Sequence, residues 1–172
     1  MFAVVSDLRL KARLNPNIEV IRVELEGEEP VREGSVFYHR FRKWGRTLEY
    51  RSRCVRCEPP RLFETRGEGG PAFAVRVTVE PAAVGCRLTQ EEAVEVEPEM
   101  FDALEPPPLG ARRFRDFVRL LLLFPGGRPL GRELGALQRE RLARRLSDEL
   151  QAWLEGIRQH VERMRPQGAA CA

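Results

Sequence analysis

Hydrophobic and polar side chains alternate in one short segment after another between residues 18 and 97. In the clearest segment, 72–80, Phe73, Val75 and Val77 fall on one side of an extended chain. This period of two predicts strands with one buried face, and the turn sequences between the segments favour a meander of consecutive antiparallel strands. The expected strands begin at Ile18, occupy 35–55 as two segments joined near Trp44-Gly45, and continue at 62–66, 72–80 and 86–97.

Both ends of the chain show the period of an α-helix instead. Residues 2–14 predict two short helices, with Asp7 as the cap of the second, that end before Asn15-Pro16-Asn17. In the segment 130–164, large apolar side chains recur at steps of three and four residues, which predicts a long helix. We therefore expect an α+β fold in which a curved antiparallel sheet wraps on the C-terminal helix. The apolar stripe of that helix comprises Leu134, Leu137, Leu146, Leu150, Trp153, Ile157, Val161 and Met164.

A separate amphipathic helix is expected at 111–124, between Pro106-Pro107-Pro108 and Pro125-Gly126-Gly127. Arginines lie along one side of it, and Phe, Val and Leu side chains lie along the other. Two interpretations stay open: an interfacial helix that makes weak contact with an anionic membrane surface, or a lid that packs over the mouth of a cavity. We expect 1–172 to form a single domain that carries this helix as an insertion. The arginines are Arg112, Arg115 and Arg119.

The charges of the chain are nearly balanced. There are 29 basic and 26 acidic residues, which gives a net charge of +3. A dedicated nucleic-acid-binding protein concentrates an excess of positive charge on one surface. The composition therefore predicts no nucleic-acid partner.

The cysteines include one C-x-x-C motif, Cys54-Val-Arg-Cys57. A structural zinc site needs a second pair or histidines at finger spacing, and His39 and His160 are far away in the sequence. Residues three apart on a strand face opposite sides, so we expect free thiols, as in a reducing cytoplasm. No phosphate-binding loop or catalytic triad is recognisable either, and we expect neither a metal nor a cofactor.

The first residues, Met-Phe-Ala-Val-Val-Ser-Asp, lack both the basic region and the long apolar region of a secretory signal peptide. The longest apolar run, 120–124, is far shorter than the ~20 residues that span a bilayer. We therefore expect a cytoplasmic protein.

Four motifs occur in an order that is characteristic of one superfamily. The first motif resembles an opening helix pair that ends in Asp and is followed by Asn-Pro, and the second resembles a Gly that opens a strand. The third resembles a connection between strands that contains Glu-Pro-Pro-Arg. The fourth resembles the last hairpin of the superfamily, with Cys86 in place of the usual Thr. On these motifs the chain resembles the START-like superfamily, in particular the SRPBCC or polyketide cyclase/dehydrase group, over nearly its whole length. The motifs are "FAVVSD" with "LNPNI", "VREGSVF", "RCEPPRLFETRG" and "VTVEPAAVGCRLTQEEAVEV".

The resemblance implies a helix-grip fold, and it implies that a first strand precedes the opening helix. Because this chain starts inside that helix, we expect that the strand is missing or that the true start lies upstream of Met1. A missing strand would leave a sheet edge unpaired, and open edges promote aggregation.

The expected function is to bind a hydrophobic small molecule, lipid or polyketide-like, in a cavity between the sheet and the C-terminal helix. The alternative is an aromatase/cyclase-like or hydratase-like enzyme in which His39 or Tyr50 moves a proton. Outside that alternative we expect no catalytic residue, because no set of ionisable groups must converge. The expected ligand-binding residues are Phe37, His39, Phe41, Leu48, Tyr50, Phe63, Phe73, Val75, Val77, Leu150, Trp153 and Ile157.

Overall fold

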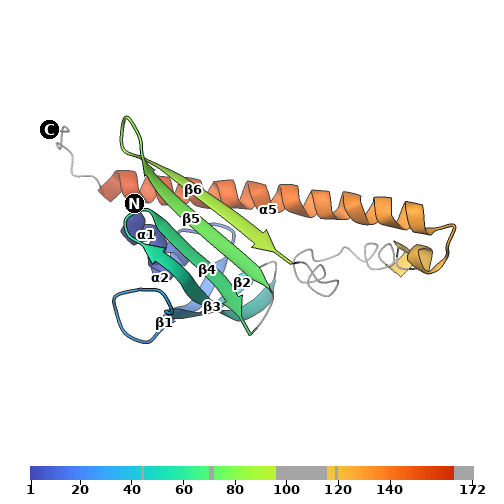
Figure 1. Ribbon diagram of the computed structural model, residues 1–172, viewed down its shortest axis with the longest axis horizontal. Coiled ribbons are helices and arrows are strands. Elements are labelled where there is room, and N and C mark those ends of the chain that lie inside the picture. Colours follow the sequence, from blue (N-terminus) through green and yellow to red (C-terminus); the bar gives the residue numbers. More distant parts are fainter. Residues whose placement is uncertain (44, 70–71, 96–115, 119, 165–172) are drawn as a thin grey trace. The chain divides into compact units, whose positions relative to one another are not determined.

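The computed structural model describes residues 1–43, 45–69, 72–95, 116–118 and 120–164. It confirms the α+β helix-grip fold: two short helices, a six-stranded antiparallel sheet and a long C-terminal helix follow one another along the chain (Figure 1). The elements are α1 (Phe2–Ser6), α2 (Leu8–Arg13), β1 (Glu19–Glu26), β2 (Val36–Lys43), β3 (Arg46–Glu58), β4 (Leu62–Glu68), β5 (Phe73–Pro81), β6 (Cys86–Val94) and α5 (Arg128–Met164).

The sheet is a simple meander in which every strand pairs with its neighbour in sequence, so that β1 and β6 form the two edges. The alternation of side chains assigns its two faces. In β2, Phe37, His39 and Phe41 are buried, whereas Arg40 between them is exposed. We call the face that carries these buried side chains the inner face. The predicted period of two is thus confirmed in the strands that build the core.

The outer face is covered by Arg–Glu pairs between neighbouring strands. Arg42 on β2 lies 3.0 Å from Glu19 on β1, and Arg76 on β5 lies 3.2 Å from Glu64 on β4. These side chains are mostly exposed, so each pair contributes little to stability. Their main effect is to keep this face of the sheet in water.

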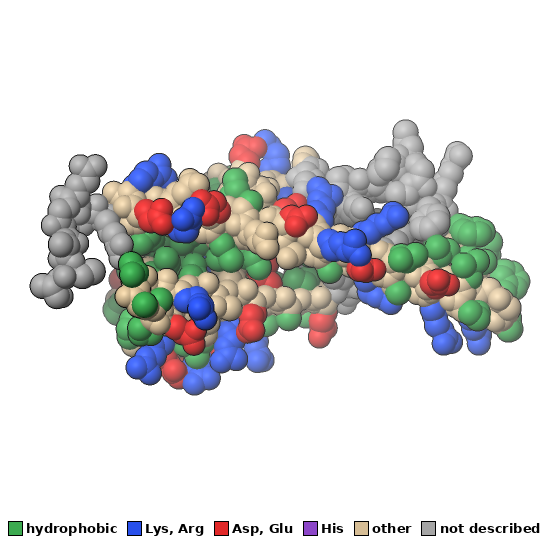
Figure 2. All heavy atoms as spheres, turned by 90° about the horizontal axis from the view of Figure 1, so that it is seen from above, with side chains coloured by type: hydrophobic (Ala, Val, Ile, Leu, Met, Phe, Trp, Pro, Cys, Tyr) green, Lys and Arg blue, Asp and Glu red, His purple; other side chains and the backbone are tan. Residues whose placement is uncertain are grey.

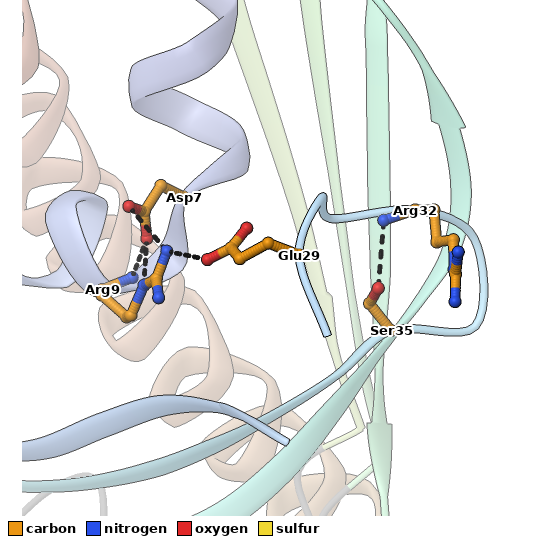
Figure 3. A network of polar contacts seen from close by, with 5 residues as sticks. All are labelled: Asp7, Arg9, Glu29, Arg32 and Ser35. Atoms are coloured by element: carbon orange, nitrogen blue, oxygen red, sulfur yellow. Dashed lines mark hydrogen bonds and ion pairs between the residues drawn. The ribbon is translucent and has the colours of Figure 1, made fainter. Parts of the chain in front are cut away.

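Figure 3 shows how the two short helices are tied to the loop between β1 and β2. Asp7 caps α2, because its carboxylate accepts a hydrogen bond from the backbone N–H of Arg9 at 3.0 Å. The Arg9 guanidinium bonds the same carboxylate at 2.8 Å and reaches Glu29 in the loop at 2.6 Å. This bridge fixes the start of α2, and with it the direction of the side chains that follow.

The core lies between the inner face and the C-terminal turns of α5. Ile157 is completely buried, together with Phe37, Phe63 and Val77 from three different strands. Neighbouring α1 contributes Val5, which is also completely buried. The predicted covering of the sheet by the long helix is therefore confirmed for this part of α5.

Helix α5 also approaches α2 closely. A Cβ atom on Gly156 would lie 2.6 Å from the backbone oxygen of Leu14, so only glycine fits at this position. Three residues earlier, the indole N–H of Trp153 donates a hydrogen bond to the backbone oxygen of Lys11 at 2.8 Å. The two contacts hold α2 against α5.

The contacts divide the chain into two compact units, 1–97 with 152–172, and 98–151. In the second unit, 116–118 and 120–123 are helical and are followed by a turn and the first part of α5. Of the expected helix at 111–124, the segment 111–115 and Arg119 lie outside the described residues. Within this unit Val118 and Leu142 are buried, and a Cβ on Gly127 would lie 2.6 Å from the backbone oxygen of Leu121. We call residues 116–118 and 120–130 the helical turn.

One expectation about the cysteines is wrong. The register of β3 against β4 shifts between Cys54 and Arg56, which marks a β-bulge. A bulge adds one residue and resets the alternation of side chains, so Cys57 packs against the same core cluster as the buried Cys54 instead of facing the other side. Within the described part of the chain both thiols are free, and burial raises the pKa of Cys54 to about 12, which makes it a poor nucleophile.

Candidate functional site

Several polar side chains gather at the otherwise apolar inner face. Of these, Lys11, His39, Ser52 and Gln90 are buried, Tyr50 is half-buried and Glu92 is exposed. They come from α2 and from strands that are distant in sequence, and their side chains interact with one another. Burial of so many polar groups in one place is unusual unless they serve each other or a ligand. We call the following residues the polar cluster: Lys11, His39, Tyr50, Ser52, Gln90 and Glu92.

His39 makes both a hydrogen bond and a ring contact within the cluster. Its Nε2 atom lies 2.8 Å from the Ser52 hydroxyl, and its ring stacks on Tyr50 with the centroids 4.7 Å apart. Burial, and then the charge of Lys11, lowers the pKa of His39 to about 4. The imidazole is therefore neutral at pH 7, held by one hydrogen bond and one ring contact.

Aromatic side chains surround Tyr50. Phe73 meets its ring edge-on at 5.0 Å, and Phe41 does so at 5.8 Å. Burial raises the pKa of the Tyr50 phenol, and so does the negative charge of Glu92. The phenol is thus a neutral polar group within an aromatic wall.

Lys11 is the most unusual residue of the cluster. It is only 2% exposed, although lysine is among the residues that are least often buried. Its ammonium lies 4.8 Å from the centroid of the Trp153 ring, a cation–π contact. Burial lowers the pKa of Lys11 to about 8, against the opposing effect of Glu92. The cluster therefore holds a cation at pH 7 that loses its proton close to neutrality.

Gln90 and Glu92 complete the cluster from β6. The Gln90 amide N–H donates to the Glu92 carboxylate, while the amide oxygen of Gln90 is buried with no hydrogen-bond partner. A buried acceptor without a partner costs stability. The polar groups of the cluster therefore do not fully satisfy one another.

The residues expected from the sequence fall into three groups. Phe37, His39, Phe41, Phe63, Val77 and Ile157 are buried, and Leu48, Tyr50, Phe73, Val75 and Trp153 are half-buried. Leu150 is half-buried but belongs to the second compact unit, so it is not placed with the others. The structure brings Phe41, His39, Tyr50 and Phe73 into direct ring contact.

Sequence reasoning missed Lys11, Gln90 and Glu92 as members of the site. A signal for Lys11 exists, because it lies three residues after the buried Leu8 and next to the buried Ala12, on the apolar stripe of α2. Gln90 is two residues from the partly buried Leu88, on the same side of β6. In both cases a polar residue occupies a position that the pattern assigns to the core.

The described residues contain no group of three or more His, Cys, Asp or Glu side chains that is arranged to hold a metal ion. None of the helices in that part of the chain is both long enough and apolar enough to cross a bilayer.

No family model matches the chain, and no curated protein matches it. Among solved structures the chain is similar to the crystal structure of Ara h 8.0201, with 16% sequence identity and a TM-score of 0.43. The match covers 64% of this chain and 73% of that chain.

Proposed function

We propose that the chain is a START-like domain that binds a hydrophobic small molecule, such as a lipid or a polyketide, on the inner face of the sheet. The observation that carries this proposal is the polar cluster set beside the aromatic wall of Phe41, Tyr50 and Phe73. Ligand sites are typically apolar surfaces with a few convergent polar groups that orient the ligand. The order of the sequence motifs gives the proposal separate support.

The apolar part of this surface has partly buried side chains at its margin. Trp153 and Leu154 from α5, and Val75 and Leu88 from the sheet, pack on the core without being fully enclosed. A bound apolar ligand would cover these half-exposed side chains and remove their surface from water. This arrangement favours binding between the sheet and residues 152–164.

The enzyme alternative, an aromatase/cyclase-like or hydratase-like reaction, has less support. A general base works best when its pKa lies near the working pH, and the pKa of His39 is lowered to about 4. The raised pKa of Tyr50 makes it a weak proton donor as well. We therefore assign His39 and Tyr50 to the orientation of a ligand.

Binding of an uncharged apolar dye tests the proposal. Nile red should become fluorescent with the folded protein, and native mass spectrometry of protein purified without detergent should show a co-purified apolar molecule. Phe73→Ser should weaken dye binding, because it removes one ring of the wall, while Tyr38→Ser serves as the matched control, because the Tyr38 ring lies on the outer face with Arg22 and Arg51. A folded protein that binds neither dye nor any apolar molecule would rule the proposal out.

The helical turn supports a second, separate contact. Leu123 is 73% exposed and Phe124 is 58% exposed, and hydrophobic side chains gather around this segment (right in Figure 2). Arg128 and Arg132 follow closely in the sequence. Exposed apolar side chains flanked by arginines suit weak binding to an anionic membrane surface, so we propose this role for the segment that includes 111–124.

A further inference from the structure

We propose that Lys11 binds the acidic head group of the ligand, and that the ligand is therefore a hydrophobic carboxylic acid. This inference rests on the proposed function, because it assigns the polar end of the same site. It concerns a residue that the sequence pattern places in the core, and it narrows the ligand from any apolar molecule to an anionic amphiphile.

The first argument is the burial of the ammonium. Lys11 is 2% exposed, and a buried positive charge is strongly unfavourable unless an anion is near. His39, whose pKa the charge of Lys11 helps to lower, is itself uncharged at pH 7. Trp153 offers a ring face, which supplies only part of what the ammonium loses when it leaves water.

Glu92 is the acidic residue whose charge reaches Lys11. It is an exposed residue at the sheet edge, and its carboxylate is already bonded by the Gln90 amide. A carboxylate that stays in water attracts a buried ammonium only weakly, because water screens the interaction. Lys11 therefore lacks a buried counter-ion among the groups that act on it, and a ligand carboxylate would supply one.

The second argument is the orphan acceptor. The amide oxygen of Gln90 is buried with no hydrogen-bond partner in the described structure. A buried acceptor and a buried cation in one cluster indicate that the polar end of the site is incomplete by itself. A head group with its bound water, or with a neighbouring hydroxyl, would complete both.

The aromatic side chains beside the polar cluster indicate the apolar part of the ligand. Phe37 lies with its ring centroid 6.3 Å from that of His39, and Phe41 and Phe73 contact Tyr50. An apolar chain or ring system would thus lie along the aromatic wall with its acid at Lys11. A cationic head would be repelled by Lys11, and an uncharged head would leave the ammonium unpaired.

Two ligands of equal chain length distinguish the contribution of the head group to binding from that of the apolar tail. We propose to displace Nile red with decanoic acid and with 1-decanol at pH 7 from the unaltered protein and from Lys11→Met. Lys43→Met is the matched control, because Lys43 is the other lysine of the chain. Charge-assisted hydrogen bonds of ordinary strength predict that Lys11→Met weakens decanoic acid binding by about 10- to 100-fold. Binding of 1-decanol should stay within about threefold, and Lys43→Met should change neither.

The outcomes are distinct. If Lys11→Met leaves decanoic acid binding unchanged, or weakens both ligands equally, the assignment of Lys11 is overturned while the proposed function stands. If neither ligand nor dye binds the unaltered protein, the proposed function fails and this inference fails with it. Lys11→Gln gives a second test should Lys11→Met not fold: it removes the charge and keeps a polar side chain, so decanoic acid should bind more weakly and 1-decanol should not. Equal effects on both ligands would again overturn the inference.

Discussion

Replacement of Lys11 by methionine should stabilise the protein at pH 7. The pKa of Lys11 falls from 10.5 to about 8 on folding, because burial penalises the ammonium. One pKa unit corresponds to about 1.4 kcal/mol, so the buried charge costs about 3 kcal/mol of stability below pH 8. Methionine has a similar length and no charge, so Lys11→Met removes this cost.

The substitution also removes the contact of the ammonium with Trp153. Such a contact contributes about 0.5–1 kcal/mol, which leaves a net gain of about 2 kcal/mol. A domain of this size gains about 2–4 °C in melting temperature for each kcal/mol. We therefore expect Lys11→Met to melt about 4–8 °C above the unaltered protein at pH 7.

The effect of pH on the free energy of unfolding follows from which state of the protein holds the Lys11 proton. Between pH 8 and 10.5 the unfolded chain holds the Lys11 proton and the folded chain has lost it, so stability rises with pH in this window. Above pH 10.5 the amine is neutral in both states and the cost has disappeared. Urea unfolding of both proteins at pH 7, 8, 9 and 10.5 gives the free energy of unfolding at each pH. The excess of this free energy in Lys11→Met over the unaltered protein should shrink to near zero at pH 10.5. A variant that is less stable at pH 7, or that differs equally at all four values, would refute the reasoning.

Three further predictions follow from other residues. The unaltered protein should lose up to about 3 kcal/mol between pH 6.5 and 4, because His39 has a pKa of about 4 when folded and the unfolded chain takes up the proton first; acid unfolding of His39→Gln should lack this loss. Ile157→Ala should cost about 2–5 kcal/mol in urea unfolding, since the side chain is completely buried, and the exposed Met164→Ala is its control. Leu123→Glu should leave the melting temperature within about 2 °C and abolish sedimentation with anionic liposomes; a large loss of stability would instead assign this side chain to the core.

The sheet was predictable from the sequence because each strand shows its faces locally. The alternation in β2 and β5 needs no information from the rest of the chain, and the turns between strands are short except for the loop 27–35. The bulge in β3 was not predictable, because an inserted residue such as Val55 has no special composition. A single unseen bulge was enough to misplace Cys57.

The polar cluster was harder to predict because its members meet only through tertiary contacts. Lys11 lies on the apolar stripe of α2, but lysine at such a position usually keeps its ammonium in water, so the pattern alone does not predict that the charge is buried. What encloses it is Trp153, which is 142 residues away in the sequence. The aromatic wall could be predicted in part, because the alternation of side chains assigns Phe41 and Tyr50 to one face of the sheet. The ammonium of Lys11 beside this wall could not be predicted.

The contact between Lys11 and Trp153 gives the protein an optical reporter. Indole emission is sensitive to a charge beside the ring, and the Trp153 ring is fixed by its hydrogen bond to the backbone of the same residue whose ammonium it faces. The chain has one other tryptophan, Trp44. With phenylalanine at position 44, the colour of the remaining emission would record the protonation of a single amine, in a protein that needs no added label.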